Sequence, residues 1–272
     1  MKKLLALALA FVMVFALAAC GGTGDNAETT TAAPDAGTAV ETDLDYIKNK
    51  GTLVVGITDY APMDYKEEGS DEWTGFDAEF ARLAAAKLGV TAEFVEIDWD
   101  NKFFELDSKA IDCIWNGMTI TDEALANASV SDPYVKNAQV VVMAADKIAD
   151  YATVESLKDL TFAVEAGSAG EEACKEADLD YTAVLTQSNA LMEVSSGAAD
   201  ACVIDITMAN AMTGEGTSYA EFTYSLELTS EEYGIACRED SDLTDALNDI
   251  MVELINDGTL ANLAEKYELT LA

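Results

Sequence analysis

From residue 43 onward the sequence alternates short apolar runs with amphipathic segments, and this alternation restricts the fold more than any other feature. Apolar runs such as 52–57 and 201–204 fit strands that are covered on both faces. Residues 76–88 instead repeat their apolar side chains at steps of three and four, as one face of a helix requires. The alternation therefore predicts an α/β fold with mainly parallel sheets.

Two series of such segments predict two lobes. The first series has expected helices at 76–88 and 103–108 and expected strands at 52–57, 94–97, 111–115 and 139–143. The second has helices beginning near residues 170, 189 and 206 and strands at 160–164, 182–185 and 201–204. An apolar run at 233–237 and two helices separated by Gly258 follow. The half-apolar stretch of about 230 residues is long enough for two modest cores or one large one.

The first 19 residues are typical of a secretory signal peptide. Lys2 and Lys3 precede an uncharged apolar stretch that is shorter than the roughly 20 residues needed to span a bilayer. The segment ends in Leu-Ala-Ala-Cys, which resembles the bacterial lipobox, where the chain is cut before the cysteine and Cys20 receives lipid. An ordinary secretory signal with an accidental cysteine is the alternative. Residues 20–42 are then expected to form a disordered tether, because they have almost no large apolar side chain to bury.

Charge and composition exclude several classes of function. The chain has 15 basic and 51 acidic residues, a net charge of −36, so nucleic acid is excluded as a partner. Neutral, zwitterionic or cationic solutes are favoured, although the acidity could equally serve only to keep an exported protein soluble. The chain contains no histidine, which removes the usual general base and the commonest zinc ligand. We therefore predict no catalytic triad, metal site or cofactor.

Four cysteines remain in the expected folded part: Cys113, Cys174, Cys202 and Cys237. They are widely spaced and form no CxxC motif. We interpret them first as small buried apolar residues and second as one or two disulfides, whose pairing the sequence leaves open.

Several motifs, taken together, resemble family 3 extracellular solute-binding proteins, the polar amino acid receptors of ABC importers. They occur in the family's order and are GFDAEF (75–80), GMTIT (117–121), SDPY (131–134), SLKDL (156–160), GS (167–168), DACVID (200–205) and DGTL (257–260). The resemblance covers nearly all of 43–272. It implies a type II periplasmic-binding fold, with lobe one at 43–143 plus 229–272 and lobe two at 144–228. The two hinge segments would lie near 142–145 and 233–236.

The resemblance also implies a function. Ligand would bind in a cleft between the lobes, and the closed protein, a monomer, would deliver it to a membrane permease coupled to an ATPase. The ligand would be an amino acid or a related small polar or cationic solute, and Cys20 would anchor the protein to the membrane. A lyase on the same fold, with Glu165 or Asp205 as general acid, and a ligand-sensing receptor subunit are the alternatives.

Lobe one contributes four residues to the implied site. Tyr60 and Trp99 match positions where relatives place aromatic or apolar walls around the ligand side chain. Gly117 and Thr119 match positions whose carbonyl and hydroxyl hold the ligand's α-ammonium and help to hold its carboxylate. Rim or core packing is the alternative for the two aromatic residues, and a strand-end or capping role for Thr119. Asp77 begins a helix and is interpreted as a structural cap, outside the site.

Lobe two contributes the other residues of the implied site. Ser168 and Ala169 match backbone amides at a helix N-terminus that hold a carboxylate. Asp205 matches the acid that pairs with the α-ammonium; capping the helix that starts at Ile206 is the alternative. Glu165 stands where relatives often place a ligand-contacting side chain, so it favours a cationic ligand unless it is only a solvated residue at the rim.

The sequence departs from the family pattern at Ala124. Relatives that bind α-amino acids carry an arginine there, five residues after the Thr119 position, and its planar guanidinium group holds the carboxylate with two hydrogen bonds. Either a lysine substitutes, with Lys136 as a candidate, or the backbone amides near Ser168 suffice, or the ligand has no carboxylate.

Overall fold

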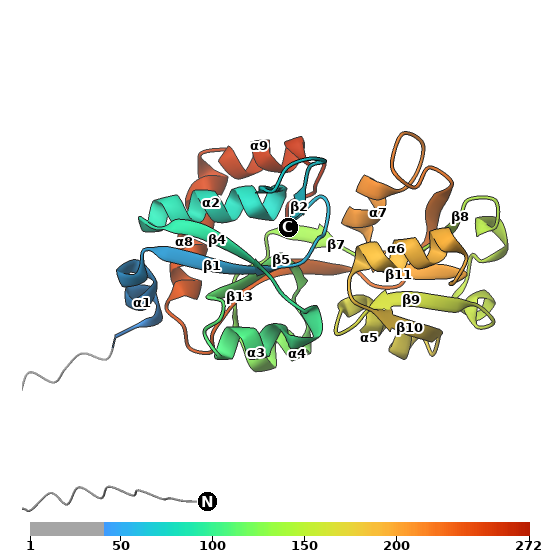
Figure 1. Cartoon of the computed structure of the whole chain (residues 1–272), viewed down its shortest axis with the longest axis horizontal. Coiled ribbons are helices and arrows are strands. Elements are labelled where there is room, and N and C mark those ends of the chain that lie inside the picture. Colours follow the sequence, from blue (N-terminus) through green and yellow to red (C-terminus); the bar gives the residue numbers. More distant parts are fainter. Residues whose placement is uncertain (1–40) are drawn as a thin grey trace, which may run out of the picture. The chain divides into compact units, whose positions relative to one another are not determined.

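The computed structural model describes residues 41–272, which belong to one compact unit. Two β-sheets organise this unit, and helices cover both faces of each sheet (Figure 1). The predicted signal peptide, Cys20 and most of the predicted tether lie outside the described residues. Over residues 41–272, no helix is both long and apolar enough to cross a bilayer.

Sheet one forms the first lobe. Its strands lie in the order β4 (Thr91–Glu96), β1 (Thr52–Ile57), β5 (Cys113–Thr119), β13 (Glu231–Cys237) and β6 (Ser129–Val130), with β7 (Val135–Asn137) also paired to β13. Strands β4, β1 and β5 are parallel, whereas β13 runs antiparallel to β5, β6 and β7. A short hairpin, β2 (Tyr65–Lys66) and β3 (Trp73–Thr74), lies apart from this sheet.

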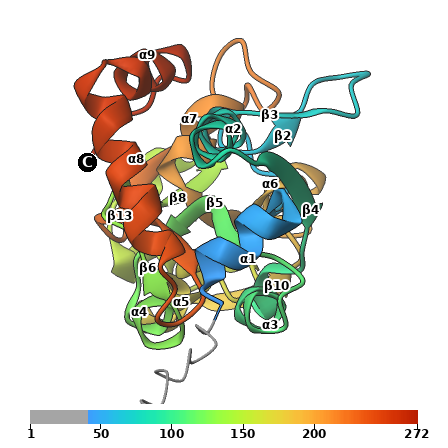
Figure 2. The ribbon, with the colours of Figure 1, turned by 90° about the vertical axis from the view of Figure 1, so that its left-hand side faces the viewer.

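Helices cover sheet one on both faces (Figure 2). One face packs against α1 (Asp43–Lys50), α2 (Phe76–Leu88), α8 (Leu243–Asn256) and α9 (Thr259–Lys266). The other face packs against α3 (Lys102–Asp107) and α4 (Asp122–Asn127). Helix α3 follows a 3-10 turn, η1 (Trp99–Asn101), which enters the cleft described below.

Sheet two forms the second lobe. Its strands lie in the order β10 (Asp180–Val184), β9 (Thr161–Glu165), β11 (Ala201–Asp205), β8 (Gln139–Ala144) and β12 (Phe222–Glu227). Strands β10, β9 and β11 are parallel, and β8 runs antiparallel to both β11 and β12. One face packs against α6 (Gln187–Ser196) and α7 (Ile206–Met212), the other against α5 (Ala169–Glu176). The 3-10 turns η2 (Ile148–Asp150) and η3 (Val154–Leu157) lie between β8 and β9 in the chain.

The strand pairing revises two details of the sequence prediction. Each sheet is mixed, with three parallel strands and antiparallel partners, because β8 and β13, the first strands after each passage between the lobes, run antiparallel to their neighbours. Strand β8 pairs with β11 and β12, so residues 139–143 belong to sheet two and not to lobe one as expected. The segments that join the sheets are thus near residue 138 and at 228–230, and the hinge expected at 233–236 lies inside β13.

All four cysteines of the described chain are free and buried, as the first interpretation expected. Cys113 and Cys237 face each other across β5 and β13, and burial raises the pKa of Cys174 and of Cys237 to about 12. Such thiols stay protonated at neutral pH and act as small apolar side chains.

Candidate functional site

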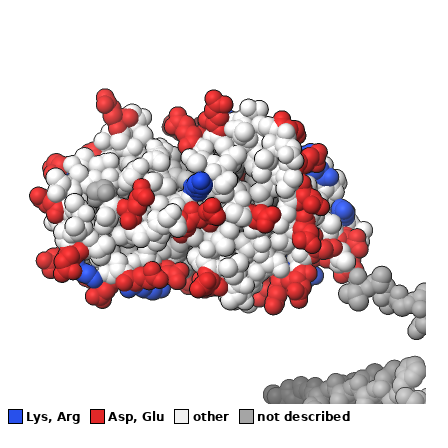
Figure 3. All heavy atoms as spheres, turned by 180° about the vertical axis from the view of Figure 1, so that it is seen from behind, with Lys and Arg blue, Asp and Glu red and all other residues white. Residues whose placement is uncertain are grey.

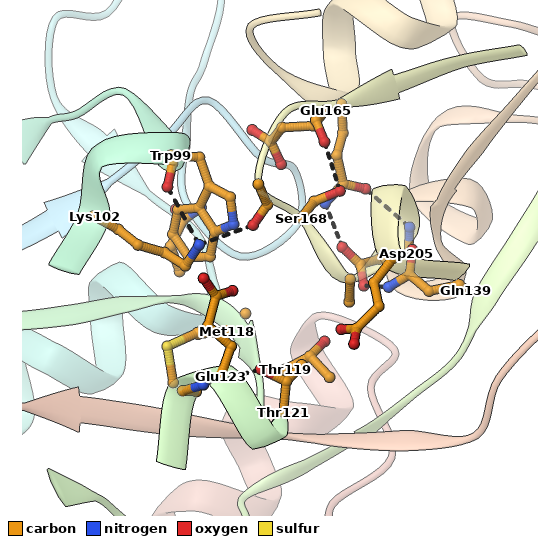
Figure 4. A pocket seen from close by; sticks show the side chains of 17 residues that line it. Trp99, Lys102, Met118, Thr119, Thr121, Glu123, Gln139, Glu165, Ser168 and Asp205 are labelled. Carbon is orange, nitrogen blue, oxygen red and sulfur yellow. Dashed lines mark hydrogen bonds between the residues drawn. The ribbon is translucent and has the colours of Figure 1, made fainter. Parts of the chain in front are cut away.

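A small cavity lies between the lobes at the carboxyl ends of strands from both sheets (Figure 4). Its volume is about 40 Å³. Because one buried water needs roughly 10–15 Å³, this space holds only a few water molecules. A larger solute can therefore enter only when the lobes or the lining side chains move apart.

Acidic side chains dominate the lining of the cavity. Glu123, Glu165, Glu172 and Asp205 contribute carboxyl groups, and Lys102 is the one cation among the described residues that line it. The acidity extends beyond the cleft, because acidic side chains are spread over the face shown in Figure 3, with few basic ones among them. The cleft is therefore suited to cations.

Asp205, the last residue of β11, is 4% exposed and held by three side-chain amides. Its carboxylate accepts hydrogen bonds from Asn137, Gln139 and Gln187. Burial raises its pKa, and these hydrogen bonds oppose the rise. It makes no capping bond to α7, which excludes the capping alternative. Asp205 is thus a fixed acidic group at the back of the cavity.

Glu231 shares the donors of Asp205. Its Oε1 accepts from Gln139 Nε2 at 2.7 Å and from Asn137 Nδ2 at 3.1 Å. Burial, followed by repulsion from Asp205, raises the pKa of Glu231 to about 7. Glu231, beside Asp205, is therefore partly protonated at neutral pH.

Glu165 ends β9 and is 3% exposed, so it is not the solvated rim residue of the alternative interpretation. Its Oε1 has no hydrogen-bond partner within the described chain. Burial, and next the nearby Asp205, raises its pKa well above the ordinary value. A buried acceptor without a partner is costly, so this oxygen is available to a donor that enters the cavity.

The N-terminus of α5 also faces the cavity. Ser168 is the N-cap; its hydroxyl accepts from the Glu171 amide at 3.1 Å and donates to the Glu165 carbonyl at 2.8 Å. Ala169 begins the helix, and both residues line the cavity. The first N–H groups of a helix have no carbonyl partner inside it and attract anions.

Gly117 and Thr119 lie at the end of β5 and line the same cavity. Gly117 has a φ of 56°, and a Cβ there would lie 2.6 Å from Tyr60 Cε1, so only glycine fits. Its amide donates to Asp77 Oδ2 at 2.6 Å. The cap of α4 is Thr121, so the capping alternative for Thr119 is wrong.

Residues 53–270 match the family described as bacterial extracellular solute-binding proteins, family 3. The chain belongs to this family. The "Arginine-binding extracellular protein ArtP" of Bacillus subtilis (strain 168) is 31% identical over 277 residues, which cover 98% of each chain. This solute-binding protein therefore aligns with that relative along nearly its whole length.

Solved structures give the fold of this solute-binding protein, the type II periplasmic-binding fold. A mutant of ArgBP from T. maritima aligns with a TM-score of 0.77 at 34% identity, over 83% of this chain and 98% of that one. An ancestral amino acid-binding protein, described as a precursor of cyclohexadienyl dehydratase, aligns with a TM-score of 0.75 at 33% identity, over 82% and 98%.

Seven of the eight residues proposed for the ligand site of this family member line the cavity: Trp99, Gly117, Thr119, Glu165, Ser168, Ala169 and Asp205. Tyr60 does not. It is 1% exposed, and its hydroxyl bonds to those of Thr207 and Tyr233. Tyr60 therefore links the two lobes, because Thr207 lies on α7 and Tyr233 on β13.

Two further expectations for this solute-binding protein need correction. Lys136 is exposed on β7 and lines a separate groove with the C-terminal segment, so it cannot replace the arginine missing at 124. Asp77 does not cap α2; its Oδ2 accepts from the Gly117 amide and from the Tyr134 hydroxyl at 2.8 Å. Ala124 lines the cavity as expected.

The titration of buried acids predicts that this solute-binding protein becomes less stable as pH rises from about 5 to about 8. Burial raises the pKa of Asp77 and of Glu231 to about 7, from ordinary values of 3.8 and 4.5. Between these values the folded chain holds protons that the unfolded chain has lost, so stability is lost as pH rises through 7. Urea unfolding at pH 5 and pH 8 measures the difference. Glu231→Gln should reduce it, and stability that increases over this range would contradict the prediction.

Proposed function

We propose that this protein captures a cationic α-amino acid, of the arginine and lysine type, between its two lobes. The charge of the cleft carries the proposal, since four carboxyl groups and one ammonium line the cavity within the described chain. Buried carboxyl groups are stabilised by a nearby cation, which lowers their raised pKa values. The name of the B. subtilis relative, an arginine-binding protein, supports the same ligand class.

Each of the seven predicted site residues that line the cavity has a role in the proposal. Asp205 pairs with the α-ammonium, with help from the Gly117 carbonyl and the Thr119 hydroxyl. Glu165 accepts from the cationic side chain, and the Trp99 ring forms a wall beside it, where a cation gains about 0.5–2 kcal/mol. The N-terminus of α5 at Ser168 and Ala169 holds the carboxylate, with the Ala169 amide as a donor left free within the described chain. Closure follows because a ligand that contacts both lobes binds the closed form more tightly.

A thermal-shift screen tests the ligand class. The protein from residue 21 onward, without Cys20, is screened at one pH against the twenty amino acids, ornithine, cystine and polyamines. Arginine, lysine or ornithine should raise the melting temperature most, because a ligand at 100 times its Kd adds about 2.7 kcal/mol of stability. Shifts confined to acidic or aliphatic amino acids would overturn the proposal.

We also propose that the mature protein is a monomer anchored by lipid on Cys20, and that it delivers its ligand to a permease and ATPase. Family membership supports the extracellular setting, and the motif before Cys20 supports the anchor. Cys20→Ser in a bacterial host should move the protein from the membrane fraction to the soluble fraction. Equal membrane retention of both forms would contradict the anchor.

A lyase is the second candidate, and Glu165 is the observation that favours it. Burial raises the pKa of Glu165 well above its ordinary value, which favours the protonated form that a general acid needs. The structural neighbour described as a precursor of a dehydratase has the same fold. We propose binding without turnover; NMR spectra of ligand incubated with the protein should stay unchanged, and new product signals would favour the lyase.

A further inference from the structure

Lys102 places an ammonium group where the two lobes meet. It is the first residue of α3, three positions after Trp99, and it is 6% exposed. Its Nζ lies 5.1 Å from the centre of the Trp99 ring and donates to the Gly167 carbonyl of the other lobe at 2.8 Å. Figure 4 shows this group inside the cavity, between Trp99 and Ser168.

Lys102 is the buried cation of the described chain that lacks a carboxylate partner. The other buried cation, Arg238, pairs with Asp43 and Asp112 at 2.9 and 3.2 Å. No described carboxylate oxygen lies within 4.0 Å of Lys102 Nζ, whose hydrogen-bond acceptors are the carbonyls of Gly167 and Trp99. Burial lowers its pKa, and Glu123 and Glu165 partly oppose this effect. A buried ammonium in this state gains most from an anion that enters the cavity.

Lys102 also lies beside a second source of positive potential, the N-terminus of α5. The carbonyl that it contacts belongs to Gly167, one residue before the N-cap of α5. The unpaired N–H groups of α5 come from lobe two, and the ammonium comes from lobe one. An anion held by both would bridge the lobes, which couples its binding to closure.

We infer that Lys102 binds the ligand carboxylate, together with the N-terminus of α5, and so replaces the arginine that is missing at Ala124. The inference rests on the proposed capture of a cationic amino acid. Lys102 is then the residue that distinguishes an amino acid from the amine of the same shape without a carboxylate. Asp205 then remains for the α-ammonium, and Glu165 for the cationic side chain at the far end of the ligand.

Arginine and agmatine, which differ by the carboxylate alone, test this inference by titration calorimetry. The wild-type protein should bind arginine more tightly than agmatine. Lys102→Met should weaken arginine binding by about 10- to 100-fold, the range for a lost charged hydrogen bond, and change agmatine binding by less than about threefold. Lys102→Arg should keep the preference for arginine, and Lys136→Met, at an exposed lysine outside the cavity, should change neither affinity.

Other outcomes overturn the inference in distinct ways. If Lys102→Met binds both ligands more tightly, the lysine occupies the place of the ligand's cation. If Lys102→Met weakens the binding of both ligands equally, or of neither, Lys102 does not recognise the carboxylate. Melting curves without ligand show whether each variant folds, and Lys102→Arg provides the test if the methionine variant does not. If the wild-type protein binds no cationic amino acid, the proposed function itself fails.

Discussion

Replacing Asp205 by asparagine is expected to weaken the binding of arginine or lysine by about 30- to 3000-fold, equivalent to about 2–5 kcal/mol. Asp205 is 4% exposed, and its carboxylate accepts from Asn137, Gln139 and Gln187. An asparagine would remove the charge that pairs with the ligand's ammonium and would direct an N–H₂ group at amide donors. Titration calorimetry of both proteins with the same ligand measures the loss.

Glu172→Gln is the matched control for Asp205→Asn. It also removes one negative charge from the lining of the cavity, but Glu172 is exposed at the rim, where water and salt screen its charge. Its effect on affinity should stay below about threefold. Equal losses in the two variants would show that the total charge of the cleft, and not the fixed carboxylate of Asp205, binds the ligand.

Replacing Gly75 by alanine is expected to lower the free energy of unfolding by about 3 kcal/mol or more. Gly75 has a φ of 115°, and a Cβ there would lie 2.2 Å from the backbone oxygen of Met63. That oxygen also accepts a hydrogen bond from the Asp77 amide at 3.0 Å, so the Met63 backbone cannot move away without breaking this bond. Urea unfolding of the variant and the parent protein measures the change.

Gly51→Ala separates backbone strain from crowding. Gly51 ends α1 with a φ of 80°, and nothing lies within 4 Å of the added Cβ. Only the strain of the left-handed conformation applies, about 1–2 kcal/mol. If Gly75→Ala costs no more than Gly51→Ala, the close approach at Met63 is not what requires glycine.

The long periodic segments of the fold were predictable from sequence. Strand β1 and helix α2 have the expected bounds of 52–57 and 76–88, because apolar runs and helical spacing depend on local sequence. The short strands β6 and β7 were missed, since two or three residues carry no measurable period. The position of β8 in sheet two was also missed, because pairing depends on distant partners.

The candidate site was predictable where a family motif marks a strand end, as at Gly117 and Asp205. The amides of Gln139 and Gln187 were not, because no motif links residues so far apart in sequence that bond to one carboxylate. Lys102 could have been found: it follows Trp99 by three residues, a spacing that places both on one side of a helical turn.

The order of the strands along the chain has a consequence for the order in which the two lobes fold. Strand β13 lies between β5 and β6 in sheet one, yet residues 231–237 come after the whole of lobe two. Lobe two pairs strands that lie within 139–227, whereas lobe one must close a loop around it. Because long loops close slowly, lobe two should gain protected amides first, which pulse-labelled hydrogen exchange would detect. Lobe one would then complete its sheet around an already folded insert.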